Sequence, residues 1–206
     1  MTASTPTTAP TSIDLRALAK QGDALNGHTP LAAFKRLSLD LPPLAEAGLP
    51  ADVALQWQAQ AEWRAPLLGS LSTELKSGVA GQPQLWLHLV VQGSVPQICQ
   101  RCLTAYPEPL DVDRWFRFVT DETTALAEDD DSEEDVLVLE PRFNLHELIE
   151  DELLMALPLV PMHEECPQPL RMSAGEADLV VEEERPHPFA ALAALKGGKK
   201  SGHKPT

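Results

Sequence analysis

The chain has 206 residues, which is enough for one domain with tails, and 43% of them are hydrophobic, which is enough for a substantial core. Its 31 acidic residues against 16 basic ones give a net charge of −15. This balance disfavours a protein that binds nucleic acid over a broad basic face, and it favours a basic protein as the partner.

The start of the chain and its cysteines bear on the compartment. Residues 1–12 are rich in Thr, Ser and Pro and carry no charged side chain, so we expect a disordered tail there. They lack the charged start and apolar core of a secretory signal, and no run of about 18 apolar residues follows elsewhere. Three cysteines do not form a disulfide framework. We therefore expect a cytoplasmic protein with no membrane segment.

Alternating apolar and polar residues predict several short strands. The clearest is 53–63, where Trp57 and Trp63 share one face with smaller apolar residues, and three glutamines and Glu62 occupy the other. The same periodicity predicts further strands over 36–41, 85–91, 111–119 and, at an edge, 136–139. Glycine and proline then predict a break at 93–96 and a turn at 106–109.

One long helix is predicted over residues 145–157. Asn144 is a good N-cap, Glu147 completes a capping box, and Pro158 ends the pattern. Shorter helices are predicted at 13–20, ending near Gly22, and at 188–195. Crowded carboxylates predict an acidic loop at about 121–135, and residues 197–206 read as a flexible basic tail.

These elements predict the α+β class. The sheet would be antiparallel, or a partly open barrel of short strands, with one main helix and short terminal helices. A single domain would then span residues 13–196.

Two short segments hold all three cysteines and one well-placed histidine. Cys99 and Cys102 are separated by two residues, and His163 and Cys166 repeat that spacing just after the predicted long helix. A structural zinc ion takes four sulfur or nitrogen ligands in a tetrahedron. The sequence therefore predicts one zinc site if the two segments meet, with Cys99, Cys102, His163 and Cys166 as ligands.

Other interpretations of these residues stay open. The cysteines could be small buried side chains, or the Cys-Gln-Arg-Cys segment could carry thiol redox chemistry. Redox motifs of this kind open a helix after a strand, whereas this one is predicted between two strands. The four tryptophans could stack on bases, but their alternation with apolar neighbours favours core positions. No phosphate loop or hydrolase motif is present, so nothing here predicts an enzyme or a small-molecule substrate.

Several of these segments resemble one family. Residues 98–103, the run 144–161, and then His163 and Cys166 are similar to the YceD family, the large ribosomal RNA subunit accumulation proteins of bacteria and plastids. Residues 185–192 resemble the Pro-Asn-Pro-Phe-Ala ending of that family, with His187 in place of Asn. The resemblance covers about residues 13–196.

The resemblance implies a cytoplasmic, non-catalytic factor needed for normal levels or processing of 23S ribosomal RNA. Genes of this family often neighbour the one for ribosomal protein L32, which makes L32 a candidate partner. The acidic chain would engage a basic ribosomal protein or a large-subunit precursor. One alternative is direct binding of precursor ribosomal RNA through the lysine tail at 196–206, and another is a thiol oxidoreductase.

Overall fold

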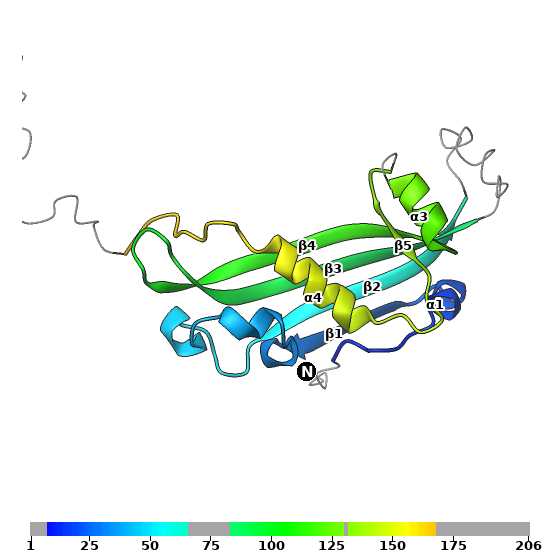
Figure 1. Cartoon of the computed structure of the whole chain (residues 1–206). Helices are drawn as coiled ribbons and strands as arrows, with labels where there is room; N and C mark the ends of the chain where they lie inside the picture. Colours follow the sequence, from blue (N-terminus) through cyan, green and yellow to red (C-terminus); the bar gives the residue numbers. More distant parts are fainter. Residues whose placement is uncertain (1–7, 66–82, 130–131, 168–206) are drawn as a thin grey trace, which may run out of the picture. The chain divides into compact units, whose positions relative to one another are not determined.

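A computed structural model describes residues 8–65, 83–129 and 132–167, and shows five strands in one open sheet (Figure 1). The strands follow the chain in the order β1 (Ala24–Pro30), β2 (Ala54–Arg64), β3 (Gln84–Ile98), β4 (Ala105–Val119) and β5 (Asp135–Val138). Successive strands from β1 to β4 are antiparallel to one another, whereas β5 runs parallel to β4. The α+β class is confirmed, with an open, mostly antiparallel sheet rather than the partly open barrel.

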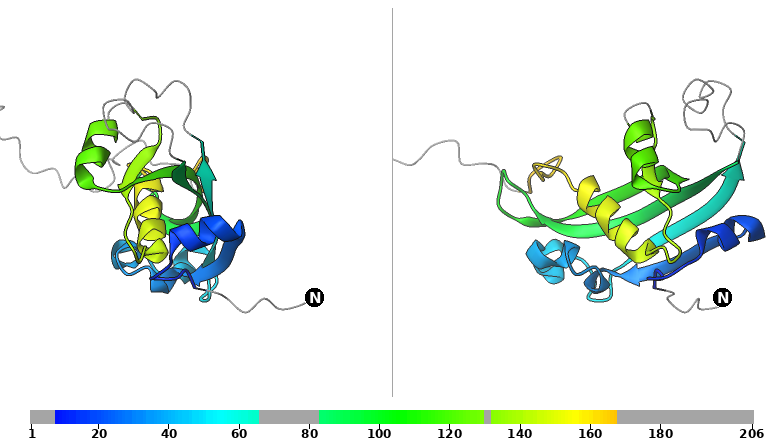
Figure 2. Two further views of the ribbon diagram at one scale, coloured as in Figure 1. Left: turned by 90° about the vertical axis from the view of Figure 1, so that its right-hand side faces the viewer. Right: turned by 45° about the vertical axis from the view of Figure 1, so that its right-hand side comes forward.

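Helices lie on both faces of this sheet (Figure 2). The described residues form the α-helices α1 (Leu15–Gln21), α3 (Glu122–Asp129) and α4 (Leu145–Ala156) and the 3-10 helices η1 (Leu31–Ala33), η2 (Leu37–Asp40) and η3 (Leu44–Ala47). The predicted first helix is confirmed: Asp14 accepts hydrogen bonds from the N–H groups of Arg16 and Ala17, and Gly22 ends the helix with φ of 73°.

The core forms where α4 packs against one face of the sheet. Leu145, Ile149 and Leu153 recur every fourth residue on α4 and are fully buried, as a helix with one apolar stripe requires. They belong to the same cluster as the inward side chains of β2, β3 and β4. Asn144 caps the helix by accepting the Glu147 N–H, so both the long helix and its cap are confirmed.

The break predicted at 93–96 is wrong, because β3 continues to Ile98. Gly93 lies opposite Leu55 of β2, and a Cβ added at position 93 would overlap Leu55 Cδ2. Glycine thus marks a close packing contact inside the strand rather than its end.

The turn predicted at 106–109 is also wrong, because β4 starts at Ala105. Beyond Gln92, β3 pairs with β4 alone, and β4 has no β5 partner before Phe116. Among the residues that the structure describes, each strand therefore has a free edge there, where a proline without an N–H group costs no ladder hydrogen bond. Pro96 and Pro107 face each other in this two-stranded part.

The strand predicted at 36–41 is wrong, since residues 37–40 form the 3-10 helix η2. The cause is a carboxylate from far along the chain. Glu150 of α4 accepts the backbone N–H groups of Arg36 and Leu37 at 2.7 and 3.2 Å. A tertiary contact thus overrides the alternating pattern, and the sequence around residue 36 contains no sign of it.

Two expectations about loops and tails need correction. Residues 122–129, expected within the acidic loop at about 121–135, form helix α3. Residues 8–12, expected within the disordered tail, include the buried Ala9, whose N–H donates to Thr29 Oγ1 at 2.9 Å. The predicted helix at 188–195 and the tail at 197–206 lie outside the described residues.

Candidate metal centre

The tip of the β3–β4 hairpin positions the first two cysteines. Cys99 donates its N–H to the Thr104 carbonyl at 3.0 Å, and Leu103 donates to the Cys99 carbonyl at 2.8 Å. Leu103 adopts φ of 59°, in the left-handed region that closes such tight turns. This turn brings Cys99 and Cys102 to one side of the hairpin end, as predicted from their spacing.

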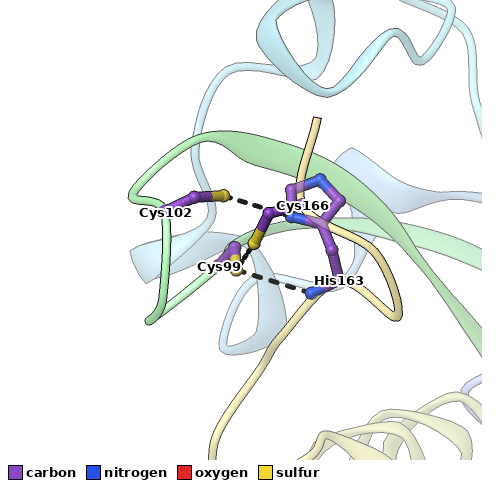
Figure 3. A group of neighbouring side chains, drawn as sticks. All are labelled: Cys99, Cys102, His163 and Cys166. Atoms are coloured by element: carbon purple, nitrogen blue, oxygen red, sulfur yellow. Dashed lines mark hydrogen bonds between the residues drawn. The ribbon is translucent and has the colours of Figure 1, made fainter. Parts of the chain in front are cut away.

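The segment after α4 supplies the other two residues. Gln100 donates its N–H to the Pro161 carbonyl at 2.9 Å, which holds the segment against the hairpin. The ligand-type atoms of Cys99, Cys102, His163 and Cys166 then all lie within 4.8 Å of one another (Figure 3). The structure thus brings together all four residues that the sequence predicted as a group.

The distances within this Cys3His cluster suit a tetrahedral metal ion. Metal–sulfur bonds of about 2.3 Å and metal–nitrogen bonds of about 2.0–2.1 Å give tetrahedral edges of about 3.8 Å between sulfurs and about 3.6 Å between sulfur and nitrogen. The Cys99 and Cys166 sulfurs lie 3.9 Å apart, and Cys102 Sγ lies 3.4 Å from His163 Nδ1. The cluster can therefore hold one metal ion of the kind that favours thiolate and imidazole ligands.

The surroundings of the cluster favour thiolates, which are the metal-binding form of cysteine. Burial opposes ionisation of Cys99, but hydrogen bonds from the His163 N–H and from nearby groups outweigh it and lower its pKa to about 5. The pKa of Cys102 is lowered as well, chiefly by its hydrogen bond with the Thr104 hydroxyl. Burial instead raises the pKa of Cys166. Because the three sulfurs lie so close together, a negative charge on one of them disfavours ionisation of the others.

Arg101 is a functional residue of the cluster that the sequence prediction did not assign. Its Nε donates to Cys166 Sγ at 3.0 Å, and its Nη2 donates to the His163 carbonyl at 2.8 Å. The guanidinium thus supplies positive charge to the thiolate cluster and also binds the backbone between His163 and Cys166. Its place between Cys99 and Cys102 is the only sequence signal that points to this role.

The His163 ring is held from its other side by Tyr106 of β4. The two ring centroids lie 4.5 Å apart with an interplanar angle of 36°. Burial raises the pKa of Tyr106, whose hydroxyl donates to Glu108, so the phenol stays neutral beside the cluster. Orienting groups of this kind are a usual part of metal sites, because they fix the ligand ring before the metal binds.

The same geometry disfavours redox chemistry at Cys99. This residue is fully buried, and the motif lies between two antiparallel strands rather than at the start of a helix. A redox thiolate must be reached by its substrate, usually at a helix N-terminus. The chain is thus an α+β protein whose three cysteines and one histidine, at the end of an antiparallel hairpin, form a group that could hold a metal ion.

Comparison with known proteins identifies the family within that class. The family model "Large ribosomal RNA subunit accumulation protein YceD" matches residues 87–196. A protein of Haemophilus influenzae with that same name is 34% identical over 179 residues, covering 78% of this chain and 97% of the relative. The chain therefore belongs to the YceD family. No solved structure matches it. Within the described residues, no helix is long and apolar enough to cross a membrane.

Proposed function

We propose that this protein is a non-catalytic cytoplasmic factor that the cell needs for normal accumulation of 23S ribosomal RNA. The observation that carries the proposal is its match, over nearly the full length of the relative, to a large ribosomal RNA subunit accumulation protein. The Cys3His cluster supports the non-catalytic part, since all three cysteines of the chain lie in one group of structural-metal type. Such thiols also require a reducing compartment.

The charge of the chain supports a basic protein as its direct partner. The net charge is −15, and the arginines at positions 36, 64, 114 and 117 each pair with a carboxylate of the same chain. The excess negative charge is therefore left to face other molecules. A basic ribosomal protein, with L32 as a candidate, or a large-subunit precursor that carries such proteins is the partner we propose.

Depletion of the protein in its source organism tests this function. We expect mature 23S RNA to fall relative to 16S RNA, measured by quantitative hybridisation, and its precursors to change in abundance. A tagged copy should cosediment with large-subunit precursors or their proteins. An unchanged ratio of 23S to 16S RNA after depletion would overturn the proposal, and a copy that sediments alone would overturn the proposed partner.

Direct binding of precursor ribosomal RNA is the alternative, and one observation in the structure weighs against it. His88 stacks on Trp115 with ring centroids 4.1 Å apart, and the Arg64 guanidinium lies 3.7 Å from the same ring centroid. Groups this close to one centroid must take opposite faces, so neither face of Trp115 is free for a base. Trp57 and Trp86 are buried, whereas Trp63 is exposed, so the core position expected for all four tryptophans is wrong for Trp63.

The lysine tail offers the sharper test of that alternative. If it binds RNA, removal of residues 196–206 should weaken the affinity and flatten its dependence on salt. An equal affinity of the full chain and the truncated chain for precursor RNA would exclude the tail as the binding element. An insulin-reduction assay addresses the remaining alternative, and we expect no thiol oxidoreductase activity.

We further propose that Cys99, Cys102, His163 and Cys166 bind one structural zinc ion. The metal would join the hairpin tip to the segment after α4, and it would neutralise the thiolates that this arrangement favours. Zinc suits the ligand set because it accepts sulfur and nitrogen in a tetrahedron and carries no redox chemistry of its own. Large apolar side chains at this end, Leu103 and Leu159 among them, stay exposed and would be held in a fixed arrangement.

Elemental analysis of protein purified without a tag tests the zinc proposal. We expect about one zinc per chain, lost in the Cys102→Ser and His163→Asn variants. The His28→Asn variant is the matched control, because His28 is exposed on β1 and lies outside the cluster. Wild-type protein without metal, or a Cys102→Ser variant that keeps it, would contradict the proposal.

A further inference from the structure

Strand β5 forms an edge of the sheet, and its outer side is open among the described residues. It pairs only with β4, and Leu139 donates its N–H to the Val119 carbonyl at 2.8 Å. Backbone groups alternate in direction along a strand, so Leu137 also faces β4, whereas Val136 and Val138 turn their N–H and C=O groups outward. An open edge of this kind is a template for another strand.

A groove runs along this open edge between α3 and α4, which lie on opposite faces of the sheet (Figure 2). Its volume is about 440 Å³. Apolar side chains from both helices, from β5 and from the segment just before α4 line it, namely Ala125, Val136, Leu137, Val138, Phe143 and Leu148. It lies at the end of β4 away from the Cys3His cluster, so the two sites can be altered separately.

The charged residues that line the groove are all acidic. Glu122, Glu140, Glu147 and Asp151 contribute carboxylates, and no lysine or arginine of the described residues lines it. Asp151 pairs with Arg36 at 2.6 Å, whereas the other three carboxylates form no ion pair within the part of the chain that the structure describes. An apolar floor with an acidic rim is complementary to a segment that carries apolar and basic side chains.

Two ion pairs join β4 to two of the elements that line the groove. Arg117 is buried and binds Glu128 of α3, and Arg114 binds Asp135 at the start of β5. Helix α3 and strand β5 are thereby attached to the sheet on the two sides of the edge. A groove whose walls are already ordered loses little entropy when a ligand enters, which favours binding.

We propose that this groove binds an extended basic segment of a protein partner, which pairs with the outer edge of β5 as an additional strand. Backbone hydrogen bonds to Val136 and Val138 would supply affinity, and the carboxylate rim would select lysine or arginine side chains. The proposal rests on the proposed function, because it identifies the chemistry by which the acidic factor would recognise a basic ribosomal protein. The acidic rim disfavours RNA as the occupant.

Binding of a short fluorescent peptide of alternating lysine and valine to the full chain tests the proposal. The Glu140→Lys variant should weaken binding about tenfold because it reverses one rim charge. Glu46→Lys, an exposed site on η3 with the same change in net charge, is the matched control and should bind nearly as wild type. Equal losses in the two variants would show attraction by net charge alone and would overturn the proposal.

The strand-pairing part has its own test. Val138→Pro removes one outward N–H group without removing a bond to β4, and it should weaken binding about fivefold, as expected for one lost hydrogen bond. A peptide with alternate backbone amides methylated keeps its charge but cannot pair, so it should bind weakly to wild type and give no further loss with Val138→Pro. If the methylated peptide binds as well as the parent, strand pairing is excluded, whether or not the proline variant folds.

Cells that carry Val138→Pro as their only copy separate this proposal from the proposed function. We expect reduced 23S RNA, less severe than after depletion and at unchanged protein level. Normal 23S RNA in these cells, with a clear defect after depletion, would overturn the groove proposal alone. Normal 23S RNA after depletion itself would overturn the proposed function, and peptide binding in vitro would then stand without it.

Discussion

Glu150 is a buried carboxylate that ties helix α4 to the segment before η2, and its replacement by glutamine tests how this fold is held together. Its Oε1 accepts the N–H groups of Arg36 and Leu37 at 2.7 and 3.2 Å, and its Oε2 accepts from Arg36 Nε at 3.1 Å. Glutamine keeps one oxygen as an acceptor, but its NH₂ group takes the place of the other oxygen and faces a donor. The substitution also removes the negative charge of the carboxylate.

We expect Glu150→Gln to lower the free energy of unfolding by about 2–3 kcal/mol, since hydrogen bonds to a charged group contribute about 1.5–3 kcal/mol and neutral ones about 0.5–1.5. The Arg36 side chain is half exposed, so most of the loss comes from the two backbone donors rather than from the ion pair. At about 2–4 °C per kcal/mol, the melting temperature should fall by about 4–12 °C.

Asp151→Asn is the matched control, because Asp151 is the next residue and pairs with the same arginine at 2.6 Å, but its side chain is half exposed rather than buried. It should cost less than about 1 kcal/mol. Thermal and urea unfolding of both variants measures the difference. A loss in Glu150→Gln no greater than that in Asp151→Asn would refute the conclusion that backbone hydrogen bonds to a buried carboxylate form η2.

The pH dependence of this difference has a defined sign. Burial raises the pKa of Glu150, but hydrogen bonds from Leu37 and Arg36 outweigh it and hold the pKa below the ordinary value of 4.5. A carboxyl whose pKa is lowered by folding stabilises the protein fully above its unfolded pKa and loses that contribution as the pH falls through the folded value. The gap between wild type and Glu150→Gln should therefore be full near pH 7 and shrink below about pH 4.5.

Three further variants test other parts of the structure. Burial raises the pKa of Glu152. The contribution of Glu152 to stability is therefore lost as the pH rises through that pKa. The melting temperature of Glu152→Gln should rise relative to that of wild type from pH 4 to 7. Gly93→Ala should cost about 1–3 kcal/mol in urea unfolding, because the new methyl group overlaps Leu55. Arg101→Met should weaken zinc affinity about tenfold in a chelator competition, because the donor to the Cys166 sulfur is lost. If a variant leaves the melting temperature, the free energy of unfolding or the zinc affinity unchanged, the physical reason given for that variant is contradicted.

Local sequence patterns predicted the elements whose stability is local. The helix at 145–157 needed only its apolar spacing and its Asn144 cap, and both are present in α4. The strand at 53–63 likewise alternates over its whole length, and β2 follows it closely. The proximity of Cys99 and Cys102 to His163 and Cys166 was predicted from ligand chemistry, because a zinc site would constrain residue types and spacing.

The remaining elements depend on contacts that the local sequence does not contain. Gly93 and Pro96 look like strand breakers until Leu55 and the free edges of the hairpin are known. Strand β1 was not predicted, and it forms by pairing along its whole length with β2, from Ala24 opposite Gln60 to Pro30 opposite Ala54. The 3-10 helix η2 depends on Glu150, which follows it by more than a hundred residues in the chain.

X-ray absorption spectroscopy at the zinc edge tests the metal site, on which the account of the Cys3His cluster depends. Protein purified without a tag should show a first shell of three sulfur atoms at about 2.3 Å and one nitrogen at about 2.0–2.1 Å, with the nitrogen lost in His163→Asn. A shell of oxygen and nitrogen atoms, or a spectrum that His163→Asn leaves unchanged, would contradict the assignment of Cys99, Cys102, His163 and Cys166 as the ligands.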